Sequence, residues 1–258
     1  MNNLERYYEK FDEEKRLTRR HGQVEFFVTW QFLQKYLKEF AAPKIADIGA
    51  GTGAYAIPLC DQGFDITAVE YVKNNLQKLR AKHKNIKTFL GDAKKLEMLN
   101  DNTFDVTLLL GPMYHAVSQK EKLDSLSEAK RVTKDGGIIF VAYYMNEYAV
   151  IKHGFVEGNI TKEFENGNID ENFHIISREN DLYSFDRLDD INLYNQKLKL
   201  ERLTIFAPDG ASDYMRDILN QMDENTFELY KKYQLTMAEN ENLLSASSHL
   251  VDVLRVIK

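Results

Sequence analysis

The chain has 258 residues, of which 43% are hydrophobic and 29% are charged, as in one large globular domain. No apolar run reaches the ~20 residues of a membrane span, and the polar N-terminus lacks a signal-peptide core, so we expect a cytoplasmic protein with no membrane partner. The net charge of −6 argues against a nucleic-acid partner. The single cysteine and six scattered histidines predict no metal site.

Residues 1–40 are predicted to form a helical cap. Apolar side chains recur at spacings of one, three and four between Phe26 and Leu37, which gives a helix one apolar face. Pro43 is expected to end this segment, because the residue before a proline disfavours the helical conformation.

Residues 41–145 alternate between short apolar strands and helical segments with short connections. This order is typical of an open, doubly wound, mostly parallel sheet in an α/β fold. Residues 104–110 are almost entirely apolar, as expected for a strand at the buried centre of such a sheet. The predicted strands are residues 44–48, 65–70, 86–90, 104–110 and 138–144, and the predicted helices are residues 52–61, 72–82 and 120–133.

The sequence becomes less regular after Tyr144. Residues 146–181 are polar and rich in Asn, Glu and Gly, and we predict that residues 146–190 form an inserted lid over the carboxyl edge of the sheet. Residues 191–258 complete the single domain, with a final strand antiparallel to the others. The predicted elements there are a strand at 198–206, a helix at 212–239 and a strand at 249–257.

A glycine-rich loop, DIGAGTG at residues 47–53, follows the first strand. Ligands of open α/β sheets bind beyond the carboxyl ends of the strands. Gly49, Gly51 and Gly53 permit positive φ angles and close approach of the backbone to a ligand, and the next helix offers N–H groups to an anion. The loop alone suits either a pyrophosphate or a carboxylate, because it also matches the dinucleotide pattern G-x-G-x-x-A.

Two carboxylates follow the next two strands. Glu70 closes the second strand, where a carboxylate can accept hydrogen bonds from ribose hydroxyls, as also occurs in NAD enzymes. Asp92, within Gly91-Asp92-Ala93, is placed where an adenine edge could meet a carboxylate and a backbone N–H. Each residue has a structural alternative, since Asp and Glu also cap helices.

Together these segments resemble the class I S-adenosylmethionine-dependent methyltransferase family. The resemblance implies a Rossmann-like, seven-stranded sheet with an antiparallel last strand, and S-adenosyl-L-methionine as the cofactor. It covers about residues 40–145, and regions outside this core resemble a prokaryotic subgroup that mostly lacks assigned substrates. The core segments are residues 45–54, Glu70, 91–93, 104–110 and 131–137, and the subgroup segments are residues 16–17, 25–29, 110–115 and 245–250.

The resemblance also implies roles for single residues. Glu70 would hold the ribose, Asp92 would meet the adenine amino group, and Asp47 would help to hold the amino group of the methionine part. The three glycines of the loop would pass beneath that methionine part. The expected cofactor-binding residues are Asp47, Gly49, Ala50, Gly51, Gly53, Glu70, Tyr71, Asp92, Ala93 and Leu110.

The fourth strand ends in GPMYH at residues 111–115, where this family brings the methyl acceptor to the sulfonium. The segment lacks the Asn/Asp-Pro-Pro-aromatic motif of adenine and glutamine methylation and the Pro-Cys nucleophile of cytosine methylation. Tyr114 and His115 are therefore the candidate catalytic residues. His115 is either a general base or a loop histidine without chemical role, and Tyr114 packs on the sulfonium, the substrate or the core.

We expect methyl transfer to an oxygen or nitrogen of a small molecule, whose identity the sequence does not give. Methylation of protein or RNA, a non-catalytic S-adenosylmethionine-binding module, and an NAD(P)-dependent oxidoreductase stay open as alternatives, and the oligomeric state is not indicated. Alignment in a site closed to water supplies much of such catalysis, so residues 1–40 and 146–181 are predicted lids. The aromatic residues Tyr143, Tyr144, Phe155, Phe164 and Phe173 are predicted to line a pocket or to pack in the core.

Overall fold

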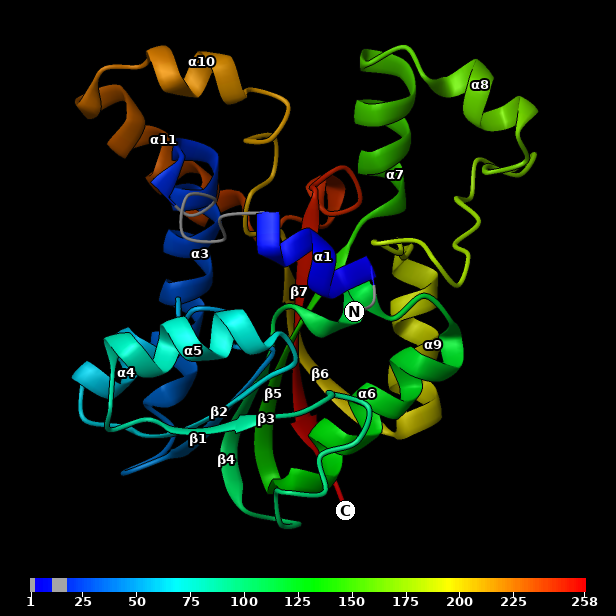
Figure 1. Ribbon diagram of the computed structural model, residues 1–258. Coiled ribbons are helices and arrows are strands. Elements are labelled where there is room, and N and C mark those ends of the chain that lie inside the picture. Colours follow the sequence, from blue (N-terminus) through cyan, green and yellow to red (C-terminus); the bar gives the residue numbers. More distant parts are fainter. Residues whose placement is uncertain (1–2, 11–17) are drawn as a thin grey trace.

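A seven-stranded sheet forms the centre of a computed structural model, which describes residues 3–10 and 18–258 (Figure 1). Residues 16–17 of the subgroup resemblance lie outside the described residues. The strand order is β3-β2-β1-β4-β5-β7-β6, and β7 is antiparallel to β5 and β6 while the other pairs are parallel, so the predicted sheet is confirmed. The strands are β1 Lys44–Ile48, β2 Asp65–Glu70, β3 Lys87–Leu90, β4 Phe104–Leu109, β5 Thr133–Tyr144, β6 Leu200–Phe206 and β7 His249–Val256.

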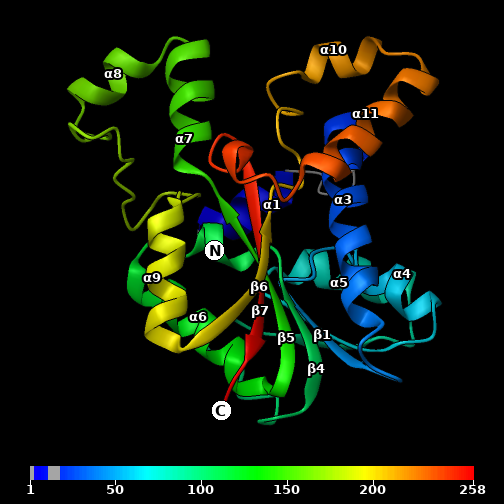
Figure 2. The same cartoon turned by 180° about the vertical axis from the view of Figure 1, so that it is seen from behind.

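Helices cover both faces of the sheet (Figures 1 and 2). One apolar cluster joins the sheet to α6 and α9, and a second joins the opposite face to α3, α4 and α5. The helices are α1 Asn3–Lys10, α3 Arg20–Leu37, α4 Ala56–Asp61, α5 Lys73–Lys82, α6 Gln119–Val132, α7 Asn146–Ala149, α8 Ile160–Glu165, α9 Leu188–Leu198, α10 Arg216–Gln221 and α11 Glu224–Met237, with 3-10 helices η1 Pro112–His115 and η3 Glu241–Leu243 and the π-helix η2 Val150–Val156.

Strand β5 shows why the sheet is buried on both sides. Successive side chains of a strand point to opposite faces, so a strand covered on both faces is apolar throughout. Ile138 and Phe140 pack in the cluster under α3, whereas Ile139 and Tyr143 pack in the cluster under α6 and α9. Tyr143 is completely buried and therefore belongs to the core rather than to a pocket.

Some helix and strand ends differ from the predictions for local reasons. Helix α4 begins at Ala56, not at residue 52, because Gly51 and Gly53 have φ angles of 57° and 95°, which no α-helix accommodates. The predicted helix at 212–239 is divided into α10 and α11, since Asp223 caps α11 by accepting a hydrogen bond from the Thr226 N–H. Strand β5 begins at Thr133, and its register with β4 shifts before Val106.

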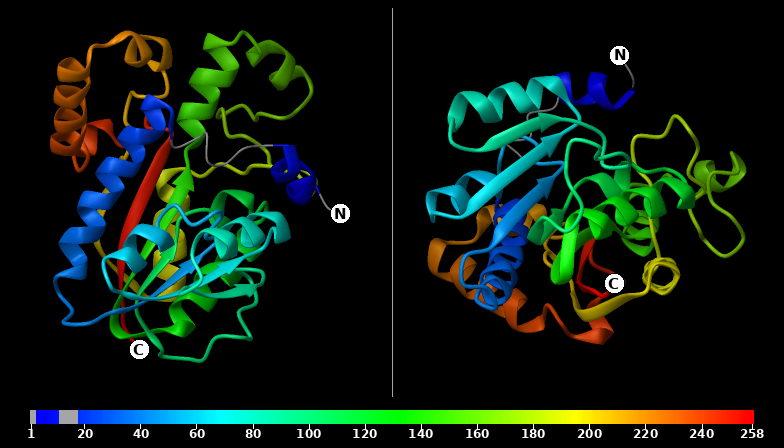
Figure 3. Two further views of the ribbon diagram at one scale, coloured as in Figure 1. Left: turned by 60° about the vertical axis from the view of Figure 1, so that its left-hand side comes forward. Right: turned by 90° about the horizontal axis from the view of Figure 1, so that it is seen from below.

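Two groups of helices extend beyond the carboxyl ends of the strands (Figures 1 and 2). Helices α7, η2 and α8, from the predicted lid, extend on one side, while α10 and α11 extend on the other. Helix α1 is separate from α3 and lies across the carboxyl ends of the strands (Figures 1 and 3). This end of the sheet is therefore surrounded by segments from the beginning, middle and end of the sequence.

Candidate active site

A cavity of about 440 Å³ lies at the carboxyl ends of β1, β2, β3 and β4. In the sheet order, β1 and β4 are neighbours from which the chain continues in opposite directions, which is where doubly wound sheets bind ligands. All of the predicted cofactor and catalytic residues except Gly53 line this cavity. Those lining it are Asp47, Gly49, Ala50, Gly51, Glu70, Tyr71, Asp92, Ala93, Leu110, Tyr114 and His115.

The three glycines of the loop have different surroundings. Gly49 has a φ of 77°, and a Cβ there would lie 2.7 Å from Pro112 Cδ, so the loop packs directly against η1. Gly51 also has a positive φ angle and donates its N–H to Glu70 Oε2 at 2.8 Å. Gly53 faces away from the cavity, because its Cβ would lie 2.5 Å from Leu79 Cδ1 of α5. The third glycine therefore allows α5 to pack closely against the loop.

Glu70 is buried and held by the backbone on both sides. Its Oε2 accepts the Gly51 N–H and its Oε1 accepts the Val72 N–H at 2.7 Å. These bonds fix the carboxylate between the loops that follow β1 and β2. The carboxylate therefore faces the cavity in one orientation, as recognition of paired hydroxyls requires.

Asp47 carries a buried oxygen without a partner. Its Oδ2 is buried and has no hydrogen bond in the described part of the chain. Burial, followed by repulsion from Glu70, raises the pKa of Asp47 to about 7, and a hydrogen bond from the Ala56 N–H opposes this increase. A buried acceptor of this kind is costly unless a ligand pairs with it. The amino group of a methionine moiety is a donor that fits this position.

Asp92 forms a turn at the end of β3. Its Oδ1 accepts the Lys94 N–H at 2.9 Å, and Lys94 Nζ lies 3.7 Å from Oδ2 and 2.7 Å from Glu121 Oε1. Asp92 therefore does not cap a helix, which was its structural alternative, because residues 91–103 between β3 and β4 form turns and no helix. Its side chain is also 39% exposed and borders the cavity, so the carboxylate is open to a ligand bound there.

His115 is poorly suited to accept a proton. Its Nδ1 lies 2.8 Å from the carbonyl oxygen of Leu182, and since a carbonyl only accepts, Nδ1 carries the proton. Its Nε2 then accepts from the Tyr8 hydroxyl at 3.0 Å. Burial lowers the pKa of His115 to about 4, partly offset by the bond to Leu182. The ring is therefore neutral near pH 7 and joins helix α1 to the segment before α9.

Tyr114 lines the cavity beside His115. Its hydroxyl donates to the carbonyl oxygen of Leu110 at 3.2 Å, which fixes the ring at the end of β4. The ring centroid lies 6.2 Å from that of Tyr144 and 6.3 Å from that of Tyr183. Tyr114 is therefore the point at which the cavity meets a larger group of aromatic side chains.

Residues from both predicted lids line the cavity. Helix α1 contributes three of them, and Glu179, Asn180 and Asp181 are those that the inserted segment contributes. Phe173 instead contacts both Phe155 and Phe164, and all three rings are more than 40% exposed. The sequence offered no signal for the lining residues of α1, which are Leu4, Arg6 and Tyr8.

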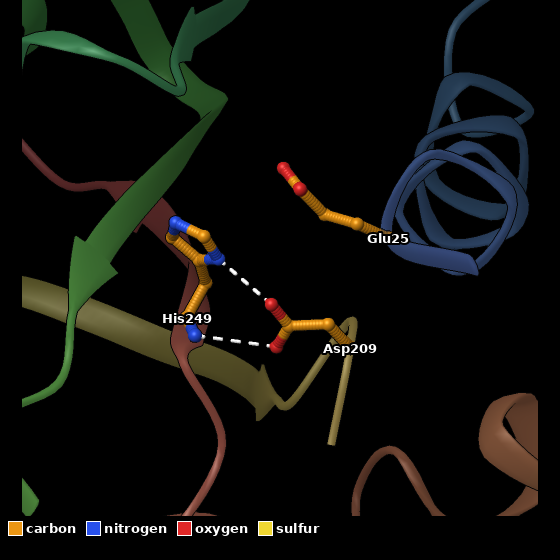
Figure 4. A group of neighbouring side chains, drawn as sticks. All are labelled: Glu25, Asp209 and His249. Carbon is orange, nitrogen blue, oxygen red and sulfur yellow. Dashed lines mark hydrogen bonds and ion pairs between the residues drawn. The ribbon is translucent and has the colours of Figure 1, made fainter. Parts of the chain in front are cut away.

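Figure 4 shows a second cluster of polar side chains, and one of its members, His249, stacks on the ring of Tyr144. Glu25 from α3, Asp209 after β6 and His249 of β7 each offer a ligand atom within 4.8 Å of the others. These three residues are far apart in the chain, and no sequence motif connects them. They are the described residues whose spacing comes nearest to that of a cation site.

Comparisons with known proteins agree with this geometry. A family profile described as "Methyltransferase domain" matches residues 46–141. The glycine/sarcosine N-methyltransferase of Aphanothece halophytica is 28% identical over 54% of this chain and 52% of that enzyme. The ubiquinone biosynthesis O-methyltransferase of Rickettsia typhi is 24% identical over 69% of this chain and 70% of that enzyme. The CcbJ methyltransferase of Streptomyces caelestis shares the fold, with a TM-score of 0.60 at 15% identity over 100% of this chain and 97% of that one.

The matched residues 46–141 include the loops after β1 to β4 that line the cavity, and the fold of the chain is the one found in S-adenosylmethionine-dependent methyltransferases. The family implies S-adenosyl-L-methionine as the cofactor, and the unpaired oxygen of Asp47, the fixed carboxylate of Glu70 and the position of Asp92 fit its three parts. The alignment spans only about half of the length of the glycine/sarcosine enzyme. Among residues 3–10 and 18–258, no helix has the length and apolar character needed to cross a membrane.

Proposed function

We propose that the protein transfers a methyl group from S-adenosyl-L-methionine to an oxygen or nitrogen atom of a small molecule. The identity of the methyl donor is proposed from one observation. The cavity lies where the chain leaves β1 and β4 in opposite directions, and it is bordered by Asp47, Glu70 and Asp92. When bound, the donor supplies an activated methyl group on a positively charged sulfur. The residues of the cavity bind and orient it, and α1 limits the access of water.

The proposed contacts follow the order of the loops. Glu70 accepts hydrogen bonds from the ribose hydroxyls, and Asp92 accepts one from the adenine amino group. Asp47 pairs its Oδ2 with the amino group of the methionine part, while Gly49 and Gly51 pass beneath that part. Tyr71, Ala50, Ala93 and Leu110 supply the remaining walls, and Gly53 acts indirectly by keeping the loop close to α5.

The acceptor half of the proposal rests on the size of the cavity and on the relatives. The cavity has a volume of about 440 Å³ and is bordered by α1 and by residues 179–181, which favours a small acceptor over a folded protein or RNA. The relatives named above are described as acting on glycine or sarcosine and in ubiquinone biosynthesis, and thus on small molecules with nitrogen or oxygen acceptors. The net charge of −6 also favours a small molecule over RNA. A cytoplasmic location stays a prediction.

Isothermal titration calorimetry with S-adenosylmethionine, S-adenosylhomocysteine and NAD tests the donor. We expect both sulfur nucleosides to bind and NAD not to bind. Glu70→Ala should weaken S-adenosylhomocysteine about 10-fold to 100-fold, because it removes the ribose acceptor and leaves two N–H groups unpaired. Glu97→Ala, at an exposed carboxylate paired with Lys95, is the matched control and should bind normally. Binding of NAD alone would refute the proposal.

The acceptor class is tested by incubating the protein with methyl-labelled donor and a small-molecule extract of cells. We expect label to appear in a compound that passes a small-pore membrane and to remain bound to oxygen or nitrogen. Label found only in protein or RNA added to the same reaction would favour the alternative acceptors. Donor binding without transfer to any of the three pools would favour a non-catalytic binding module.

A further inference from the structure

Asn75 and Ser125 are two uncharged polar residues that line the cavity and have no part in the contacts proposed above. Asn75 belongs to α5 and is 2% exposed, and Ser125 belongs to α6 and is 1% exposed. Neither side chain makes a hydrogen bond within the part of the chain that the structure describes. Since both residues are otherwise enclosed, the surface that they retain borders the cavity.

Buried polar side chains in native proteins nearly always have a hydrogen-bond partner, because an unpaired one lowers the stability of the fold. Two buried residues of the same types elsewhere in the chain follow this rule. Asn146 is 1% exposed, and its amide donates to the carbonyl oxygen of Phe173 at 3.0 Å and accepts the Ile175 N–H at 2.8 Å. Ser184, also 1% exposed, donates to the carbonyl oxygen of Ala116 at 2.7 Å. The unpaired amide and hydroxyl in the cavity are therefore expected to pair with a ligand.

Asn75 lies beside the carboxylate that is proposed to bind the ribose. It follows Val72 by three residues, and the Val72 N–H donates to Glu70 Oε1 at 2.7 Å. Four residues further along α5, the side chain of Leu79 packs under the glycine loop, only 2.5 Å from the position of a Cβ on Gly53. Residues three and four apart share one face of a helix. Asn75 is therefore on the face of α5 that meets the loops after β1 and β2.

Ser125 lies beside the carboxylate that is proposed to bind the adenine. It follows Glu121 by four residues and so shares a face of α6 with it. Glu121 Oε1 lies 2.7 Å from Lys94 Nζ, which in turn lies 3.7 Å from Asp92 Oδ2. Helix α6 packs on one face of the sheet and α5 on the other (Figures 1 and 2). The hydroxyl and the amide therefore approach the space between Glu70 and Asp92 from opposite sides.

We propose that Asn75 and Ser125 form hydrogen bonds with the nucleoside part of S-adenosyl-L-methionine. This inference rests on the proposed function and adds two binding residues to it. The ionised carboxylates of Glu70 and Asp92 can only accept hydrogen bonds, whereas an amide and a hydroxyl can also donate them. The ring nitrogens of adenine and the ring oxygen of ribose are acceptors, which carboxylates cannot pair with. Asn75 and Ser125 supply the donors that these atoms need.

Calorimetric titration with S-adenosylhomocysteine tests both contacts. Asn75→Leu and Ser125→Ala should each weaken binding about 10-fold, because each variant removes one hydrogen bond to a buried ligand atom. Asn75→Ala should weaken binding to a similar extent, which separates the loss of the hydrogen bond from the bulk of leucine. Wild-type affinity in Asn75→Ala or in Ser125→Ala would overturn the inference.

A truncated ligand shows which part of the donor the two residues contact. 5′-Methylthioadenosine keeps the adenine and the ribose but lacks the amino-acid part. Asn75→Ala and Ser125→Ala should weaken methylthioadenosine by the same factor as S-adenosylhomocysteine, because the lost hydrogen bonds lie in the shared part. A loss of affinity confined to S-adenosylhomocysteine would place the contacts on the amino-acid part and contradict the inference.

The melting temperature of the ligand-free protein gives a second readout with matched controls. Asn75→Leu and Ser125→Ala should not lower it, because the groups that they remove have no partner in the fold. Asn146→Leu and Ser184→Ala remove paired groups that do not line the cavity, so they should lower the melting temperature and keep normal affinity for S-adenosylhomocysteine. A fall in Asn75→Leu and Ser125→Ala as large as in these controls would indicate a structural role and overturn the inference.

The same titrations distinguish failure of this inference from failure of the proposed function. If the wild-type protein binds NAD and neither S-adenosylhomocysteine nor methylthioadenosine, the proposed function itself fails. If the wild-type protein binds both sulfur nucleosides and the variants of Asn75 and Ser125 bind them equally well, only the inference about these two residues fails.

Discussion

Asp47 combines three features that are costly for a carboxyl group in a folded protein. It is buried, it lies near the charge of Glu70, and one of its oxygens lacks a partner. The resulting pKa of about 7 means that the protonated and ionised forms are both populated near neutral pH. A positively charged amino group would select the ionised form. Binding of the donor and ionisation of Asp47 are therefore coupled.

Asp47→Asn should raise the thermal stability of the free protein and weaken its affinity for S-adenosylhomocysteine. The folded pKa of Asp47 is raised from about 3.8 to about 7, so its contribution to stability is fully present below about pH 4 and is lost as the pH rises through 7. Asparagine cannot ionise, so without ligand the variant should melt at a higher temperature than the wild type at about pH 8, and this difference in melting temperature should be smaller at about pH 5. Its affinity for S-adenosylhomocysteine should fall at least ~10-fold at the higher pH.

Thermal unfolding and calorimetry at these two pH values check this prediction. The Asp65→Asn variant serves as a control, because Asp65 is exposed at the other end of β2 and pairs only loosely with Lys44, at 3.9 Å. An equal change in melting temperature at both pH values would show that Asp47 does not titrate near neutrality.

At the scale of elements, a buried ion pair joins α6 to the segment that precedes α9. Lys122 Nζ contacts Asp186 Oδ2, and the two side chains are 4% and 2% exposed. Asp186 also accepts the hydroxyl of Tyr194 from α9 at 2.8 Å. This cluster anchors the far end of the inserted segment to the sheet, because the Asp186 N–H donates to the carbonyl oxygen of Tyr144 on β5.

Lys122→Met should lower the free energy of unfolding by about 3–5 kcal/mol, because it leaves the Asp186 carboxylate buried without its counter-charge. The double variant Lys122→Met/Asp186→Leu should recover most of that loss, since it removes both charges. Urea denaturation of the two variants and the wild type measures the difference. A double variant no more stable than Lys122→Met would contradict this account of the ion pair.

Helix α1 should respond to the donor although it is far in sequence from the glycine loop. Leu4, Arg6 and Tyr8 line the cavity, and the ring of Tyr8 packs edge-on against His115. S-adenosylhomocysteine should therefore slow amide hydrogen exchange in α1 and in residues 179–181 as well as in the loop. Helix α11 does not line the cavity and serves as the internal reference. Protection confined to the loops after β1 and β2 would show that α1 does not close on the ligand.

The helices and strands that could be predicted are those whose hydrophobic pattern is visible within their own short stretch of sequence. The apolar strands and the helices between them were predicted within a few residues, except where glycine geometry or a capping aspartate moved an end. Helix α9 was missed because it is rich in Asp and Asn, which favour turns and caps. It is stabilised instead by distant contacts, with Ile191 and Tyr194 buried against the sheet and α6. Such packing does not appear in the local sequence.

At the scale of the whole molecule, two sets of side chains differ in how they are brought together. One set lies on loops that follow neighbouring strands, and the other comes from distant parts of the chain. The first set lies on the loops after β1 to β4, each with its own motif, so every residue that the sequence predicted there except Gly53 lines the cavity. The side with Glu25, Asp209 and His249 is brought together only by the complete sheet and α3. His115 shows the same limit, because its pKa depends on burial and on α1, which the sequence does not reveal.

The position of β7 has a consequence for the order in which the protein can assemble during synthesis. Strand β7 lies between β5 and β6, although β6 precedes it in the chain. While the ribosome is still producing β7, β6 has no neighbour in the sheet, whereas β1 to β5 can already pair with one another. The donor pocket can thus form on a nascent chain, but Asp209 and His249 meet only after the last strand has been inserted. A partly made chain would thus have the loops of the cavity before it had the last strands of the sheet.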